Sequence, residues 1–315
     1  MSSRTVALAL AVFVTFLWST SWVLIKVGLD DLALPPLTFA GLRYLLAALI
    51  LMPLALPALR RARPWRGEGR RLLGAVMLLG LLLFALTQGA QFAALAHLPA
   101  VAVGLILSAT PVLVALLSLR GERASMLQAL GVGMLLVGAI LYFGPLQLTE
   151  SAAVGVAIAL IGMVANALAA LLGRRLARDS VAQLGGVLGL TAMSMLAGAI
   201  VLLASGLLLE QLPVLGVGAW LIIGWLALVN TALSFSLWNH SLRTLTAVES
   251  SVINNLMLIQ IALLAWVFLG EGLTAIELGG LALALAGIVS VQLAPTLLRR
   301  RRAGGPELAA EDQPT

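Results

Sequence analysis

The stretch FLWSTSWVLIK, residues 16–26, decides the fold of this chain. It lies inside an apolar run that begins near Val6 and is long enough to cross a bilayer as a helix. Trp18, Trp22 and Lys26 recur every four residues, and Ser19 falls on the same side, so these side chains form one helical stripe. Lipid does not accommodate the polar members, so the stripe faces protein or water. It either packs against another helix or lines a solute cavity.

The composition of the whole chain also indicates a membrane protein. Of its 315 residues, 61% are hydrophobic and 10% are charged, whereas soluble domains carry about 25% charged residues. The absence of cysteine excludes disulfides, thiol nucleophiles and Cys-ligated metals. The net charge of +6 does not indicate nucleic-acid binding, because the basic residues lie in short loops between apolar runs.

Ten apolar runs predict an all-α membrane protein with ten transmembrane helices. Prolines mark several of their ends, among them Pro57 after the second run. The predicted spans are residues 5–29, 35–57, 71–94, 99–119, 126–143, 154–176, 183–207, 217–241, 247–269 and 277–297.

The loop charges predict the orientation of these spans. With ten spans, every loop arginine falls on one side, and the opposite loops carry acidic residues without lysine or arginine. By the positive-inside rule, both termini are cytoplasmic. Residues 299–315 are predicted to be a basic and then disordered cytoplasmic tail.

A weak internal repeat divides the chain into residues 1–146 and 147–298, with five spans in each part. The aligned positions include Gly131 with Gly280 and Gly138 with Gly287, at an offset of 149, and Ala100 with Ala247, at an offset of 147. An odd number of spans inverts the second repeat, and inverted repeats are typical of transporters with a solute site between them. The glycines predict close helix packing, with a dimer contact as the alternative.

Several motifs, taken in order, resemble the drug/metabolite transporter superfamily in its EamA-type ten-helix branch. They are Trp18-Ser19-x-x-Trp22 with Lys26, Pro35-x-x-x-Phe39-x-x-x-Arg43, Pro111 with Glu122, and Glu271. The resemblance covers residues 5–297 and implies export of small metabolites across a bacterial cytoplasmic (inner) membrane. Overall, the chain is most similar to YddG-type exporters of aromatic and other amino acids.

Polar and tryptophan side chains in six spans predict a wet cavity with aromatic walls between the two repeats. Each amide alone is more typical of a contact between helices, but their number favours a substrate site. The predicted substrate-binding residues are Trp18, Ser19, Trp22, Arg43, Gln88, Gln91, Asn166, Asn230, Trp238 and Asn254.

Three residues have two open interpretations each. Arg43 lies about 12 Å into its span and either extends outward to the interface or faces the cavity, where it holds a carboxylate or a helix C-terminus. Lys26 either forms a solvated pair with Asp30 or belongs to an outer gate. Pro111 is either a hinge or a static kink.

The acidic residues lie at the ends of the spans and not at mid-membrane. Glu122 and Glu271 are therefore predicted to cap helices, and Glu249 forms a capping box with Thr246. Without a carboxylate at depth, the sequence predicts facilitated diffusion or exchange and not proton coupling.

We expect a transporter and not an enzyme. His97 and His240 have no acidic or metal-ligating neighbour in the sequence, so no metal, cofactor or catalytic residue is predicted. The expected partners are a small-molecule substrate and the lipid bilayer, without nucleic acid, and a monomer is favoured. A multidrug or other metabolite exporter is the alternative function, and a membrane scaffold without transport is the third.

Overall fold

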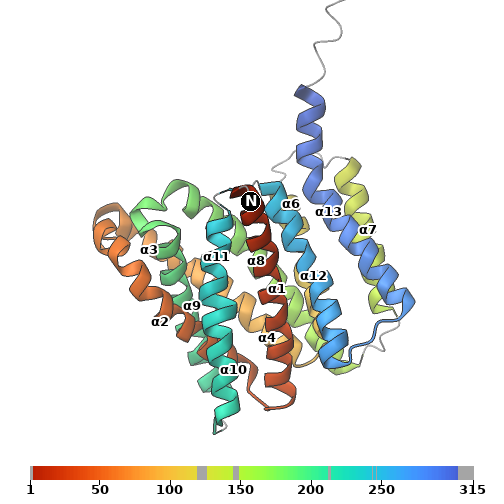
Figure 1. The fold of residues 1–315 in the computed structure, drawn as a ribbon, viewed down its shortest axis with the longest axis horizontal. Coiled ribbons are helices and arrows are strands. Elements are labelled where there is room, and N and C mark those ends of the chain that lie inside the picture. Colours follow the sequence, from red (N-terminus) through yellow and green to blue (C-terminus); the bar gives the residue numbers. More distant parts are fainter. Residues whose placement is uncertain are drawn as a thin grey trace, which may run out of the picture. The chain divides into compact units, whose positions relative to one another are not determined.

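The computed structural model describes residues 3–118, 126–144, 149–211, 214–242, 244–245 and 247–303. Every regular element in these ranges is a helix, which confirms the predicted all-α fold (Figure 1). The elements are α1 (Ser3–Asp30), α2 (Pro36–Ala62), α3 (Gly67–Gly80), η1 (Leu81–Gln88), α4 (Gly89–Leu95), α5 (Ala100–Ser108), α6 (Thr110–Ser118), α7 (Met126–Phe143), α8 (Glu150–Asp179), η2 (Ala182–Leu184), α9 (Gly186–Leu209), α10 (Val217–Ala227), η3 (Leu228–Leu233), α11 (Ser234–Ser241), α12 (Ala247–Leu269) and α13 (Ala275–Ala303).

The described helices account for the predicted spans. Nine are long and apolar enough to cross a membrane, and Ile253–Leu269 is a shorter apolar helix. The prediction that the second span ends at Pro57 is wrong, because α2 continues through Pro53 and Pro57 to Ala62. Apolar helices tolerate proline when neighbouring groups satisfy the freed backbone carbonyls. Two residues with predicted capping roles, Glu122 and Thr246, lie outside the described residues.

The chain forms two compact units that do not follow the two sequence repeats. Unit 1 contains residues 1–110 and 146–273, and unit 2 contains residues 111–145 and 274–315. Each unit therefore takes segments from both halves of the sequence. The repeat boundary near residue 146 stays a prediction.

Within unit 1, successive spans alternate in direction. We call one end the arginine end, because Arg4 lies in the first turn of α1 and Arg60 and Arg61 lie in the last turn of α2. The other is the acidic end, which carries Asp30, Glu150, Glu210 and Glu271. At the acidic end, His97 Nδ1 and Ser151 Oγ are 3.0 Å apart. Hence α8 starts where α1 finishes, as the inverted repeat requires.

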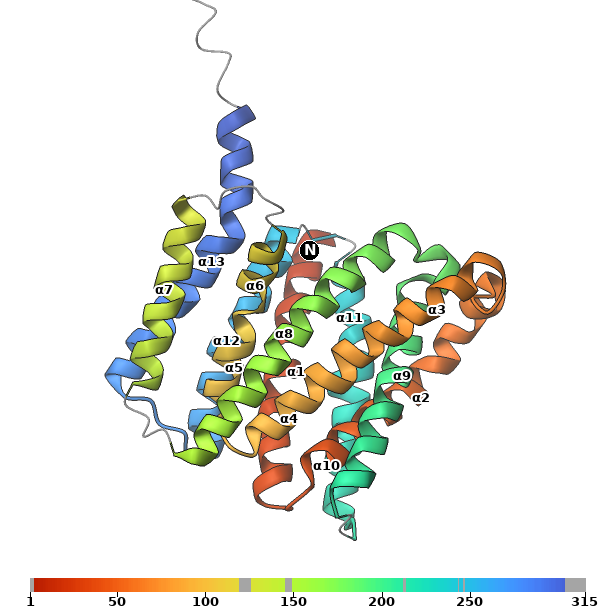
Figure 2. The ribbon, with the colours of Figure 1, turned by 180° about the vertical axis from the view of Figure 1, so that it is seen from behind.

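Unit 1 is built from closely packed helix pairs. α1 lies beside α12 (Figure 1), and α8 lies along the continuous span formed by α3, η1 and α4 (Figure 2). α2 and α9 approach so closely that a Cβ on Gly41 would lie 2.6 Å from the Cα of Leu203. Gly206 meets the backbone of Thr38 in the same way, so small residues fix this crossing.

Unit 2 contains the glycine-rich pair α7 and α13, which run side by side in both views (Figures 1 and 2). A Cβ on Gly131 would lie 2.7 Å from the carbonyl oxygen of Gly287, and one on Gly138 would lie 2.5 Å from that of Gly280. The predicted close packing is confirmed, and the two aligned glycine stripes pack against each other. The dimer alternative is not needed to explain these glycines.

Candidate functional site

A cavity of about 350 Å³ lies among α3, η1, α8, α9 and α11, in unit 1. Its polar wall is formed by Asn166, Arg174, Thr191 and Ser194. Thr191 and Ser194 lie near the beginning of α9, and Arg174 lies near the end of α8, so the cavity is on the arginine-end side. Of the ten predicted substrate-binding residues, Asn166 lines it.

Arg43 is buried within α2, with 4% of its surface exposed. Its Nε donates a hydrogen bond of 3.0 Å to Thr231 Oγ1, and its Cζ lies 5.1 Å from the ring centroid of Tyr44 and 5.8 Å from that of Phe92. No carboxylate of the described residues pairs with it. Its burial excludes the outward-extended conformation. Burying a guanidinium without an anion costs free energy.

Two aromatic residues connect Arg43 to the cavity. The Tyr44 ring lies 5.5 Å from the ring of Phe84, which lines the cavity. The Tyr44 hydroxyl donates to Gln88 Oε1 at 2.6 Å, so this predicted site residue is held against α2. Sequence reasoning missed Tyr44 and Phe84, because an aromatic residue in an apolar span has no distinguishing neighbour in the sequence.

Asn230 is completely buried in η3, beside Thr231. Its Nδ2 donates to the carbonyl oxygen of Leu17 and, at 3.0 Å, to Thr20 Oγ1. Its Oδ1 is buried and has no hydrogen-bond partner within the described part of the chain. Leaving such an acceptor unpaired costs about 1–3 kcal/mol, and a ligand donor would recover this free energy.

Trp18 and Trp238 belong to an aromatic cluster behind the cavity. The Trp18 ring lies 5.1 Å from Trp238 and 5.6 Å from Phe235, and Phe235 lines the cavity. Two other predicted residues, Trp22 and Gln91, are buried on α1 and α4, and Asn254 is half-buried on α12. These three do not line the cavity.

Ser19 lies at a helix contact in this structure. Its hydroxyl donates to the Thr15 carbonyl oxygen at 2.8 Å and is within 3.2 Å of the Met257 carbonyl oxygen and 3.1 Å of Gln260 Oε1. In the stripe of the first span, Ser19 therefore packs against another helix, as one of the two interpretations of the stripe predicted. Trp18 instead faces the aromatic cluster.

The profile of the EamA-like transporter family matches residues 5–144 and 153–292, one match in each half of the chain. The chain belongs to the EamA-like transporter family. It is thus a multi-pass membrane protein and a transporter of the drug/metabolite transporter superfamily, with a small-molecule substrate. The family assignment favours transport over catalysis.

Comparison with solved structures supports the fold of this EamA-like transporter. One match, titled "Crystal structure of protein", is 23% identical and covers 95% of this chain and 100% of its own, with a TM-score of 0.61. At this identity the likeness shows the fold alone. No curated protein matches the chain.

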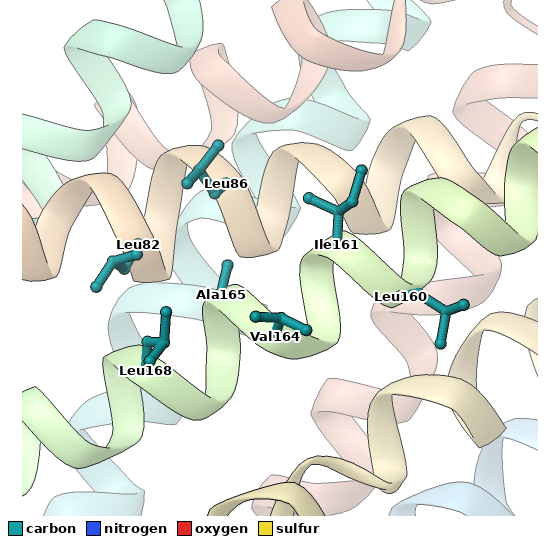
Figure 3. Close-up of a pocket in the computed structure, with 7 residues that line it drawn as sticks. All are labelled: Leu82, Leu86, Leu160, Ile161, Val164, Ala165 and Leu168. Atoms are coloured by element: carbon teal, nitrogen blue, oxygen red, sulfur yellow. The ribbon is translucent and has the colours of Figure 1, made fainter. Parts of the chain in front are cut away.

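A second hollow of the EamA-like transporter, about 360 Å³ in volume, differs in chemistry (Figure 3). It is an apolar groove between η1 and α8, and Figure 3 shows the aliphatic side chains that line it. The lining residues are Leu82, Leu86, Leu160, Ile161, Val164, Ala165 and Leu168. Without a polar group, the groove suits hydrocarbon and not a polar metabolite.

Pro111 follows a break in the fourth span of the transporter. α5 finishes at Ser108 and α6 begins at Thr110, because proline has no N–H to donate to the carbonyl oxygen of Leu107. The Thr110 hydroxyl donates to that oxygen at 2.6 Å and accepts from Asn166 Nδ2 at 3.2 Å. Pro111 is the first residue of unit 2, so the break coincides with the unit boundary.

Carboxylates from the second half of the transporter cap first-half helices at the acidic end. Glu210 accepts from the backbone N–H groups of Leu37 and Thr38, each at 2.8 Å, at the start of α2. Glu271 accepts from the N–H of Ala100, at 3.0 Å, at the start of α5. The predicted capping role of Glu271 is confirmed, although the helix that it caps is α5 and not its own.

Lys26 also lies at the acidic end. Its Nζ is 3.3 Å from Asp30 Oδ2 and donates to the carbonyl oxygen of Leu95 at 2.8 Å. The predicted pair with Asp30 is confirmed, and the second contact joins α1 to the final residue of α4.

We expect Glu210→Ala to destabilise the transporter by about 1–2 kcal/mol, because α2 begins after Pro35 without a side-chain cap of its own. Differential scanning fluorimetry in detergent would measure this as a lower unfolding temperature. The control is Asp31→Ala, which removes an exposed acid at the same end. Equal unfolding temperatures for the two variants would contradict the capping role.

Proposed function

We propose that this EamA-like transporter exports amino acids, including aromatic ones. The proposal rests on one observation: the buried guanidinium of Arg43 is bonded to Thr231, and the residue before Thr231, Asn230, has a buried hydrogen-bond acceptor. Arg43 donates to Thr231 through Nε and has no carboxylate partner among the described residues, and Asn230, which precedes Thr231, has a buried Oδ1 without a hydrogen-bond partner. An α-amino acid carries a carboxylate for the first and an ammonium for the second.

The aromatic residues support a substrate with an apolar side chain. Phe84 and Phe235 face the cavity, and Tyr44 and Trp18 lie behind them. A cavity of about 350 Å³ is within the range of small-molecule sites. An aromatic side chain would pack against these rings while its polar groups reach Arg43 and Asn230.

The position of the cavity supports the direction of transport. It lies toward the arginine end, which the positive-inside rule places in the cytoplasm of a bacterial cell. The acidic end is held by the contacts of Glu210, Glu271 and Lys26. We infer loading from the cytoplasm and release at the opposite side by alternating access, driven by exchange or by the substrate gradient.

A multidrug exporter of lipophilic cations is the second candidate. The buried, unpaired guanidinium of Arg43 disfavours it, because a second cation nearby would be repelled in a medium of low dielectric constant. An exporter of other carboxylate-bearing metabolites remains compatible with the same site.

Counterflow in proteoliposomes distinguishes these functions. We expect vesicles loaded with unlabelled phenylalanine to accumulate labelled phenylalanine without a pH gradient. Phenethylamine lacks the carboxylate and 3-phenylpropionate lacks the ammonium, so each should compete at least about tenfold more weakly than phenylalanine. Protein-free vesicles are the control. Stronger competition by phenethylamine would support the cation exporter, and no counterflow of any amino acid would overturn the proposed substrate class.

A further inference from the structure

Two spans of the transporter contain a π-helical segment at equivalent positions. η1 begins at Leu81 and η3 begins at Leu228, an offset of 147 residues. The same offset relates Ala100 to Ala247, the first residues of α5 and α12. π-Helical turns are uncommon and are concentrated at functional sites. Their recurrence at one offset makes them a shared feature of the two repeats.

Buried hydroxyl groups make bonds of π geometry at both segments, from Thr87 within η1 and from Ser234, the first residue after η3. Thr87 Oγ1 donates to the Leu82 carbonyl oxygen at 2.7 Å, and Ser234 Oγ donates to that of Val229 at 2.8 Å. Both bonds reach five residues back, and the two residues are again related by the offset of 147. Thr231 makes a third bond of this kind, to Leu226.

Hydroxyl groups in ordinary α-helical turns of α11 and α9 bond differently. Ser236 donates four residues back, to Ala232, and Thr191 donates four residues back, to Val187. A bond to the fifth residue back therefore belongs to the wider π turn. Removing it withdraws a contribution that favours the π register over the α register.

The helices that follow the two π segments lead to opposite ends of unit 1. α4 runs from η1 to the acidic end, where Leu95 accepts the hydrogen bond from Lys26. α11 runs from η3 to the arginine end and carries Phe235 and Trp238 against Trp18. A change from π to α register shifts the following helix by one residue, which is a rotation of about 100° and a translation of about 1.5 Å.

Two consecutive residues of α2 each contact one of the two π segments. Arg43 donates to Thr231 in η3, and Tyr44 donates to Gln88 in η1. A ligand on Arg43 would therefore lie one hydrogen bond from the Thr231 hydroxyl of η3, and the neighbouring Tyr44 links α2 to η1.

We propose that Thr87, Thr231 and Ser234 are positioning residues of the transport cycle. They hold η1 and η3 in the π register, and the two segments are the hinges on which α4 and α11 open opposite ends of the transporter. Substrate bound at Arg43 biases the hinges through Thr231 and Tyr44; this last step rests on the proposed function.

The hinges are testable without a substrate, because the chain has no cysteine and accepts single-cysteine reporters. Ala94 on α4 and Ser241 on α11 are both fully buried. We expect Thr87→Val to change the rate at which maleimide labels Ala94→Cys by about fivefold. Ser234→Ala should change the labelling rate of Ser241→Cys by a similar factor. About fivefold is the change in an equilibrium expected from the loss of one hydrogen bond. The matched control is Ser236→Ala, which removes an α-type bond from the same helix. Equal rates in all variants would overturn the proposal.

Counterflow of phenylalanine then separates positioning from binding. We expect Thr87→Val and Ser234→Ala to lower the maximal rate about fivefold with little change in KM, and Thr87→Ser and Ser234→Thr to restore it. A higher KM at an unchanged maximal rate would overturn the hinge role. Failure of the wild type to carry phenylalanine would reject the proposed substrate, while the labelling experiment would still decide the hinges.

Discussion

Arg43→Gln is expected to weaken phenylalanine binding about 30- to 100-fold, corresponding to the loss of about 2–3 kcal/mol of charge-assisted hydrogen bonding. Arg43 is the buried cation without a carboxylate partner in the described part of the chain, and it is held in place by Thr231. Arg43→Lys keeps the charge but not the planar donor fork, so its affinity should be intermediate. A scintillation proximity assay on purified protein would measure the dissociation constants.

The same substitution should not unfold the protein. Removing a buried, unpaired charge relieves its desolvation cost, so the unfolding temperature of Arg43→Gln should equal or exceed that of the wild type. Arg175→Gln is the control, because Arg175 is exposed on α8 and does not line the cavity. Wild-type affinity in Arg43→Gln would remove the basis for a carboxylate site. An equal loss of phenethylamine binding would show that the effect does not concern the carboxylate.

Gly138→Ala is expected to cause the largest loss of stability among single methyl additions to α7. The new Cβ would lie 2.5 Å from both the Gly280 oxygen and the Ala284 nitrogen, which are backbone atoms that cannot rotate away. We expect a loss of about 3 kcal/mol, seen as a fall in the unfolding temperature of about 5–10 °C.

Gly133→Ala provides a matched control on the same helix. A Cβ at Gly133 meets no atom within 4 Å, and alanine favours the helix over glycine, so stability should be unchanged or slightly higher. Similar unfolding temperatures for Gly133→Ala and Gly138→Ala would contradict the packing of α7 on α13.

The spans were predictable because apolar length alone specifies them. In a bilayer each backbone polar group must be satisfied within its own segment, so an apolar run of sufficient length is a helix. Close helix packing at the glycines was also predictable, since small residues allow close approach, but their sequence spacing did not show that the two stripes contact each other. The prediction failed at Pro57, where α2 continues, because local proline chemistry does not decide where an apolar helix ends.

The candidate site was predictable only in part. Arg43 and Asn230 are recognisable as polar residues in apolar spans, and the structure buries both of them. Glu210 was recognised only as a loop acid, because the helix that it caps lies more than 170 residues earlier in the chain. Phe84 and Phe235 were missed, since a ring facing a cavity and a ring facing lipid are equivalent in sequence.

The sequence by itself determined that this protein is an all-helical, multi-span membrane protein with an internal repeat, because hydropathy and repeated glycines act locally or through simple periodicity. Only the tertiary structure decided which polar groups are satisfied. Ser19 finds partners across a helix contact, whereas the buried Oδ1 of Asn230 has no partner among the described residues. The π register of η1 and η3 likewise depends on packing and on hydroxyl contacts, since the same residues are compatible with ordinary α-helix.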